Sequence, residues 1–139
     1  ASCLVGSEMC IRDSPRTRDA IFDYNLEYLL ENPKFIIIDP LGYLDFIFLV
    51  KHSRSIWTDS GGIQEESSYL GVPCYTLREN TERPVTLTLG SNKLVKISKE
   101  TIVSNQLQNK NNNNSKRNKC DIPLWDGNTA SRILKKLIK

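Results

Sequence analysis

Short apolar runs recur along the chain and are separated by longer segments that mix apolar and polar positions. Residues 35–38, 55–58, 73–77 and 93–97 form these runs, and each is flanked by turn-forming residues. Runs of this length that are rich in β-branched and aromatic side chains predict β-strands. The first run is apolar at every position, which is typical of a strand buried in a parallel sheet.

The longer segments predict helices. Residues 18–30 carry an apolar stripe that is followed by an Asn-Pro stop signal. Residues 43–50 are apolar enough for a strand or a helix, and we favour a helix because parallel strands on either side need a crossover connection. Residues 63–70 continue a glycine turn as a helix, and two more helices are predicted over residues 99–107 and 129–139. The alternation of strand and helix predicts an α/β domain with a parallel sheet.

A glycine turn at the start of a helix follows the second run. Its sequence is DSGGIQEE at residues 59–66. The first N–H groups of a helix have no partner within it, and the helix dipole adds partial positive charge. Gly61 and Gly62 have no Cβ to block a phosphate, and Ser60 could cap the helix or donate to the same anion. The alternative is a simple turn before a capped helix.

Two charged residues near this turn suit a nucleotide diphosphate-sugar. Glu66 lies one turn into the helix, where its carboxylate could accept both ribose hydroxyls. The alternative for Glu65 and Glu66 is that they only complement the helix dipole. Arg83 lies in a loop after a strand, and its planar fork suits phosphate, although a surface arginine is the alternative. Ligands of parallel sheets bind at the carboxyl ends of the strands, where this turn lies.

Composition narrows the possible functions. The 139 residues suffice for one core, and a net charge of +3 is too small to indicate nucleic acid. The longest apolar run, residues 46–50, is too short to span a bilayer. The four cysteines show no paired spacing, so we expect no metal, no cofactor and no disulfide framework, and Cys74 reads as a small buried thiol. A reduced, cytoplasmic setting is the default, and His52 is expected to be a surface histidine.

Two segments are expected to lie outside the packed domain. Residues 1–14 show neither helical nor strand periodicity and resemble translated library adapter DNA, so we interpret them as a non-native leader. Residues 109–119 contain four consecutive asparagines amid lysines, which predicts a disordered insertion. The domain itself is then expected over residues 15–139.

The longer motifs closely resemble the non-hydrolysing UDP-N-acetylglucosamine 2-epimerases. The resemblance begins at Pro15, where this family has a histidine in the place of Ser14, and it covers only the C-terminal half of such enzymes. It implies the C-terminal Rossmann-like domain of a glycosyltransferase-B type fold. The motifs that carry it are PLGYLDF at 40–46, DSGGIQEE at 59–66, LGVP at 70–73, TERP at 81–84, GSNKLV at 90–95 and WDG at 125–127.

The resemblance also implies a site and a reaction. It assigns the diphosphate to Ser60, Gly61 and Gly62, the ribose to Glu66, the nucleotide site to Arg83, and the uracil to the backbone of Phe46. UDP would be eliminated to leave a glycal and added back with the opposite configuration at C2, which interconverts UDP-N-acetylglucosamine and UDP-N-acetylmannosamine.

The acid and base groups of the family lie in the N-terminal half and just before Pro15. We therefore expect this chain to contain no catalytic residue, to bind UDP weakly and to catalyse nothing alone. The full-length parent is expected to be a homodimer. The alternatives are a UDP-sugar glycosyltransferase domain of the same fold and a non-catalytic nucleotide-binding module.

Overall fold

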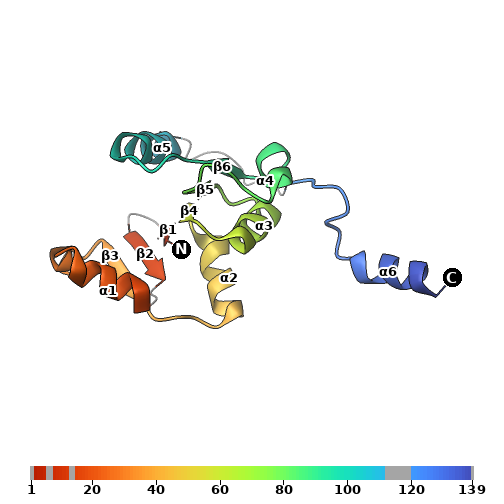
Figure 1. The fold of residues 1–139 in the computed structure, drawn as a ribbon, viewed down its shortest axis with the longest axis horizontal. Helices are drawn as coiled ribbons and strands as arrows, with labels where there is room; N and C mark the ends of the chain where they lie inside the picture. The colour runs from red at the N-terminus through yellow and green to blue at the C-terminus, as the bar shows by residue number, and fades with distance from the viewer. Residues whose placement is uncertain (1, 6–7, 13–14, 112–119, 139) are drawn as a thin grey trace.

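The computed structural model describes residues 2–5, 8–12, 15–111 and 120–138 of the chain (Figure 1). In chain order its elements are β1 (Ser2–Val5), β2 (Glu8–Arg12), α1 (Pro15–Asp23), the 3-10 helix η1 (Glu27–Leu29), β3 (Phe35–Ile38), α2 (Tyr43–His52), β4 (Ser55–Thr58), α3 (Gly61–Leu70), β5 (Cys74–Thr76), α4 (Pro84–Thr88), β6 (Asn92–Leu94), α5 (Lys99–Asn111) and α6 (Thr129–Leu137).

The strands form one sheet in the order β3-β2-β1-β4-β5-β6. β2 runs parallel to β3, and β4, β5 and β6 run parallel to one another. β1 is antiparallel to both of its neighbours, β2 and β4. All the other strands therefore point the same way, which confirms the predicted α/β class with a parallel sheet.

The first strands correct one expectation. Residues 1–14 were left out of the predicted domain because they show no side-chain periodicity, yet β1 and β2 lie in the middle of the sheet, with Arg12 alongside Ile38 and Ser2 alongside Trp57. Strands pair through main-chain N–H and C=O groups. A segment without side-chain periodicity can therefore still form hydrogen bonds with the unpaired main-chain groups at the edge of a strand. The interpretation of residues 1–14 as a non-native leader stays a prediction, as does the domain boundary at residue 15.

The core is split between the two faces of the sheet. Ile56 of β4 packs with Phe46 and Val50 of α2 and with Ile63 of α3. Val72 belongs to the same cluster. The next residue along β4, Trp57, lies in a second cluster with Tyr75 and Val95, and Leu77 and Ile102 of α5 pack against that cluster. Successive side chains of a strand point to opposite faces. α2 and α3 therefore cover one face and α5 covers the other.

Several predicted bounds change in the structure. The single helix expected over residues 18–30 is shorter, because α1 ends at Asp23 and Asn25 takes a left-handed backbone with φ 52° before η1 begins. α4 was not predicted, since TERP was read as a loop. α5 extends to Asn111, and residues 112–119 of the expected insertion lie outside the described residues. His52 is exposed as predicted, although it is the last residue of α2 rather than a loop residue.

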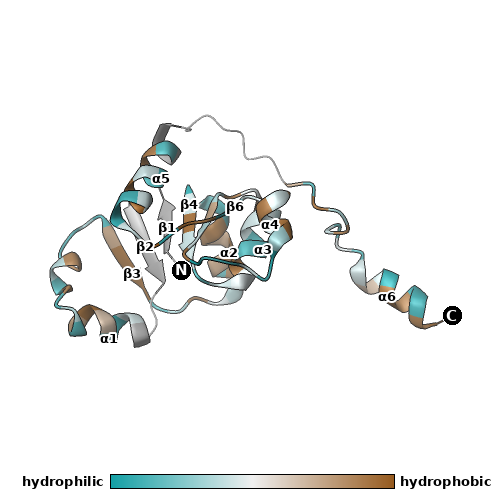
Figure 2. Ribbon diagram, turned by 45° about the horizontal axis from the view of Figure 1, so that its top comes forward, coloured by the Kyte–Doolittle hydropathy of each residue, from teal (hydrophilic) through white to brown (hydrophobic). Residues whose placement is uncertain are grey.

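The C-terminal helix forms as predicted but does not join the core. α6 stands apart from the sheet in both views (Figures 1 and 2). None of its described residues is buried, and its side chains Ile133, Leu134 and Leu137 are 53%, 55% and 75% exposed. Among the described residues, no helix has both the length and the apolar content needed to cross a bilayer.

Candidate functional site

The start of α3 is open to solvent at its two glycines. β4 ends at Thr58, and Ser60 is the N-cap residue of α3. The Ser60 hydroxyl makes no capping hydrogen bond, while its backbone N–H donates to Thr58 Oγ1 at 3.0 Å. A Cβ added to Gly61 or to Gly62 would meet no heavy atom within 4 Å. The glycines are therefore not required by packing, and the exposed N–H groups suit an anion.

The two glutamates that follow point to different partners. Glu65 Oε1 lies 2.8 Å from Arg83 Nε, and both side chains are about 40% exposed (41% for Arg83 and 42% for Glu65). This contact is an ion pair without hydrogen-bond alignment, because Arg83 Nε has no hydrogen-bond partner among the described residues. Glu66 instead interacts with Tyr43 of α2. Glu65 thus pairs with Arg83, while Glu66 interacts with Tyr43.

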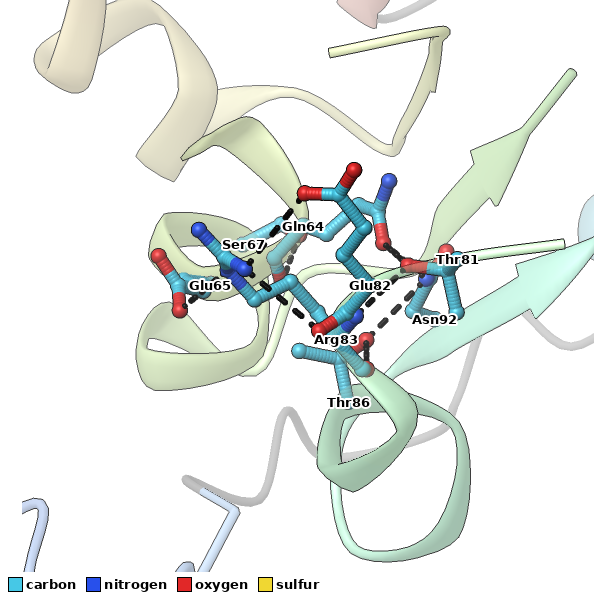
Figure 3. A network of polar contacts seen from close by, with 8 residues as sticks. All are labelled: Gln64, Glu65, Ser67, Thr81, Glu82, Arg83, Thr86 and Asn92. Atoms are coloured by element: carbon cyan, nitrogen blue, oxygen red, sulfur yellow. Dashed lines mark hydrogen bonds and ion pairs between the residues drawn. The ribbon is translucent and has the colours of Figure 1, made fainter. Parts of the chain in front are cut away.

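Arg83 is held in place through its backbone. Its N–H donates to Thr81 Oγ1 at 3.0 Å, and its carbonyl accepts from Thr86 Oγ1 at 2.7 Å (Figure 3). Thr81 Oγ1 in turn donates to Gln64 Oε1 of α3 at 2.6 Å. Of the guanidinium donors, Nη1 makes a long 3.4 Å contact to the Glu82 carbonyl. The backbone of Arg83 is therefore fixed while much of its donor capacity stays available.

A buried amide links these residues to the sheet. Asn92 Nδ2 of β6 donates to Gln64 Oε1 and to Thr86 Oγ1, each at 3.1 Å (Figure 3). Asn92 Oδ1 accepts from Thr76 Oγ1 of β5 at 2.7 Å. Gln64, Thr76, Thr86 and Asn92 are at most 3% exposed. Buried polar groups that are fully paired rigidify a structure. We name the side chains Gln64, Thr76, Thr81, Thr86 and Asn92 the amide network.

The sequence did not reveal the amide network. Gln64 and Asn92 are polar residues inside quoted motifs, but nothing in the local pattern marks them as buried, since all but one of their network partners lie 16 to 28 residues away. Phe46, which was predicted to meet the base, lies in α2 with its ring 5% exposed in the core beside Ile63. Its N–H donates to the Gly42 carbonyl at 2.9 Å. The ring is thus committed to packing, and the role assigned to its backbone stays a prediction.

A cavity of about 520 Å³ is lined by both glutamates. Its walls come from α2, α3 and the segment that leads into the start of α6: Tyr43, Ile47, Glu65, Glu66, Tyr69, Leu70, Leu124, Trp125, Gly127 and Thr129. The charge of Glu66 raises the pKa of Tyr43 above its usual value, and partial burial acts in the same direction. Tyr43 therefore stays protonated at neutral pH.

Arg132 of α6 holds the segment around Trp125, which forms one wall of the cavity, through hydrogen bonds. Arg132 of α6 donates to both carboxylate oxygens of Asp126, at 2.8 and 2.9 Å, and to the carbonyl of Leu124 at 2.8 Å. Leu124 takes a left-handed backbone with φ 70°. The N–H of Asn128 and Arg132 lower the pKa of Asp126 to about 2. These contacts turn the chain sharply between residues 124 and 129.

The cysteine predicted to be a small buried thiol has that position in the structure. Cys74 is fully buried in β5 as predicted, and burial raises its pKa, partly offset by hydrogen bonds with Ser67 and Thr76. Among the described residues, no three His, Cys, Asp or Glu side chains come together as a metal site.

A mainly parallel sheet with an open glycine turn at the start of a helix defines a Rossmann-like α/β domain. The particular family follows from direct comparison. The family model for UDP-N-acetylglucosamine 2-epimerase matches residues 9–138, and the chain belongs to this family. This match begins at residue 9, whereas the resemblance of motifs begins six residues later, at Pro15.

Relatives and solved structures agree with this assignment. The chain is 42% identical over 122 residues to the UDP-N-acetylglucosamine 2-epimerase of Methanocaldococcus jannaschii, which covers 87% of this chain and 32% of the relative. A crystal structure of the Methanocaldococcus jannaschii enzyme in complex with UDP-GlcNAc and UDP superposes with a TM-score of 0.77 at 41% identity, covering 93% of this chain and 35% of that one.

A third comparison extends the likeness to a bacterial enzyme. The UDP-GlcNAc 2-epimerase of Neisseria meningitidis, bound to UDP-GlcNAc, superposes with a TM-score of 0.73 at 32% identity over 93% of this chain and 35% of that one. The chain therefore spans about a third of the length of the relatives that it matches.

Proposed function

We propose that this chain is the UDP-binding part of an epimerase that interconverts UDP-N-acetylglucosamine and UDP-N-acetylmannosamine. The observation that carries the proposal is the open start of α3, with Arg83 anchored beside the same helix by the amide network. Two of the similar structures contain UDP-GlcNAc, and one of them also contains UDP. UDP-GlcNAc is accordingly the proposed partner of the parent enzyme, which acts as a homodimer.

Each site residue has a separate task in this proposal. The N–H groups of Gly61 and Gly62 and the hydroxyl of Ser60 hold the diphosphate, and Glu66 accepts the ribose hydroxyls. The backbone around Phe46 meets the uracil. Arg83 completes the anion site, because its planar guanidinium offers donors that fit phosphate oxygens.

The chemical contribution of this region is to stabilise the leaving group. When the bond between the sugar C1 and the diphosphate oxygen breaks, negative charge builds up on the departing UDP. Preorganised N–H donors and an arginine stabilise that charge more strongly than they stabilise the neutral bond. The same contacts hold UDP while its oxygen re-forms the bond to C1 of the glycal, and a proton is delivered to the opposite face of C2. The remaining need is proton transfer at C2.

Proton transfer is assigned to the part of the parent enzyme beyond these residues. In this chain Glu65 is paired with Arg83, and Glu66 is assigned to the ribose. We therefore expect the 139-residue chain to bind UDP and to show no epimerase activity. Mixing it with UDP-N-acetylglucosamine and following the anomeric proton by NMR tests this, and any turnover would place a catalytic residue within the chain.

A UDP titration followed by amide NMR tests the binding site. The amides of Gly61, Gly62 and Glu66 should shift, and Arg83→Ala should weaken binding about tenfold, since charged hydrogen bonds are worth about 1.5–3 kcal/mol. Lys34→Ala is the matched control: it removes one exposed positive charge just before β3, at the opposite edge of the sheet. Shifts confined to other surfaces, or equal effects of the two substitutions, would contradict the proposed site.

A product assay on the full-length protein separates the epimerase from a glycosyltransferase of the same fold. An epimerase converts UDP-N-acetylglucosamine without an acceptor and reaches the same mixture from either sugar. A glycosyltransferase would need an acceptor and would release UDP. A nucleotide-binding module would do neither.

A further inference from the structure

The structure assigns a partner to Glu66 that the sequence did not suggest. Tyr43 and Glu66 come from different helices and line the same cavity. We propose that Tyr43 is a positioning residue that orients the Glu66 carboxylate toward the ribose, and that it thereby sets the preference of the site for ribonucleotides over 2′-deoxyribonucleotides. This inference rests on the proposed function, because it takes Glu66 as the ribose acceptor.

The core fixes the relative positions of the two side chains. Phe46 of α2 and Ile63 of α3 pack in one buried cluster. Tyr43 precedes Phe46 by three residues, and Glu66 follows Ile63 by three residues. Residues three apart on a helix are neighbours on one face. The packing of α2 against α3 therefore supports both side chains, which line the same cavity.

A hydrogen bond from Tyr43 would leave the carboxylate free to accept a diol. An ionised glutamate has about four acceptor positions, and a ribose uses two donors. A Tyr43 hydroxyl that donates across the shared cavity wall would occupy one position and leave the others available. Without it, Glu66 would have to give up rotamer freedom on binding, which opposes association. Among the described residues Glu66 forms no ion pair, in contrast to Glu65, so its charge is not already neutralised by a cation.

Tyr43 is also suited to this task by its own surroundings. Its side chain is 65% exposed, so removing its hydroxyl leaves the core untouched. Because Glu66 raises its pKa, the hydroxyl remains a donor throughout the neutral range. A phenolate at this position would repel the carboxylate instead.

The test compares UDP with 2′-deoxy-UDP by calorimetry on the 139-residue chain. The unchanged chain should bind UDP more tightly than 2′-deoxy-UDP, since only UDP offers both hydroxyls. Tyr43→Phe should weaken UDP binding about threefold to tenfold, because the substitution acts on UDP only indirectly, through one hydrogen bond to Glu66. It should change 2′-deoxy-UDP binding less, so the preference for UDP should shrink. Tyr28→Phe, at another exposed tyrosine on η1, should leave both affinities and their ratio unchanged.

The outcomes separate this inference from the proposed function. If Glu66→Ala abolishes the preference for UDP but Tyr43→Phe preserves it, Tyr43 does not position Glu66 and the inference alone is overturned. Equal weakening of both ligands by Tyr43→Phe also overturns it, because a tyrosine that merely shapes the cavity wall would act on both. If the unchanged chain binds UDP with no preference, or does not bind UDP, the assignment of Glu66 to the ribose fails and the inference falls with it.

Discussion

α3 and α6 are helices of similar length, but they differ in how well the hydrophobic pattern of the sequence matches the packing of the helix. α6 carries its apolar side chains on one face, yet none of its nine described residues is buried. α3 has ten residues, of which Ile63, Gln64, Ser67 and Ser68 are buried, so most of its buried side chains are polar. An amphipathic pattern thus indicates that a helix forms, but it does not say what the helix packs against.

The difference lies in which interactions fix each helix. α3 is tied to the sheet by directional bonds, such as the amide network and the Ser91 N–H, which donates to Ser68 Oγ at 3.3 Å. α6 is tied mainly at its first turns, through Arg132 and Asp126. A helix whose start binds an anion has to be held rigidly, because its N–H groups act only if they are preorganised. Substitutions in the two helices should therefore differ sharply in their effects.

The largest loss of stability is expected from a substitution at Gly90, just before β6, where the chain passes close to α3. A Cβ on Gly90 would lie 2.4 Å from Ser68 Oγ and 2.5 Å from the Thr86 carbonyl oxygen. Gly90→Ala should lower the free energy of unfolding by about 3 kcal/mol, since the backbone has to shift. Urea denaturation followed by Trp57 fluorescence measures this. A loss below about 1 kcal/mol would mean that α4 moves away from α3 without cost.

A smaller loss is expected from the amide network. Asn92→Ala takes the acceptor from Thr76 Oγ1 and one of the two hydrogen bonds from each of Gln64 Oε1 and Thr86 Oγ1. A buried group that loses its partner costs about 1–3 kcal/mol, partly relieved by water that enters the space, so we expect a net loss of about 2 kcal/mol. Lys93→Ala, at the exposed neighbour in β6, should change stability by less than about 0.5 kcal/mol. Similar losses for the two variants would show that Asn92 is dispensable.

Much of the sheet was predictable because it depends on local signals. The apolar run at residues 35–38 became β3, and the glycine turn at 59–66 became the start of α3. These features are encoded by β-branched runs and by glycines, which act over a few residues. The family resemblance then named the residues of the site.

The rest depended on distant partners. Gln64 and Asn92 look like ordinary polar residues until the fold brings them together across 28 positions. Tyr43 read as an apolar helix position, and only the packing of α2 on α3 revealed its contact with Glu66. β1 and β2 arise from main-chain pairing, for which residues 1–14 show no side-chain pattern. Interactions of this kind leave no periodic trace in the sequence.

Gly62→Ala should separate binding from stability. The glycine has open space around its Cβ position and lies in α3, so alanine should leave stability unchanged or raise it by up to about 1 kcal/mol. UDP affinity should fall about tenfold or more, because the methyl group would stand where the diphosphate approaches the backbone. Thermal unfolding and UDP titration measure the two effects. Unchanged affinity would contradict the proposed anion site.

The turn before α6 should respond to acid. The pKa of Asp126 is lowered from 3.8 to about 2 by Asn128 and Arg132. A carboxyl with a lower pKa in the folded chain stabilises it above pH 3.8, and this contribution is lost as the pH falls toward 2. The carboxyl carbon-13 shift of Asp126 should titrate near pH 2 in the unchanged chain. In Arg132→Gln its midpoint should move toward the ordinary value, and an unmoved midpoint would contradict the contact.

The smallest effect is expected on α6. Leu137→Gln exchanges an apolar side chain that is 75% exposed for a polar one of similar helix propensity. The free energy of unfolding should change by less than about 0.5 kcal/mol. Ile63→Gln in α3 is the matched substitution at a buried position, and it should cost several times more because it places an amide in the core. If Leu137→Gln instead lowered the melting temperature, and did so more strongly at high protein concentration, α6 would be packed against a second copy of the chain.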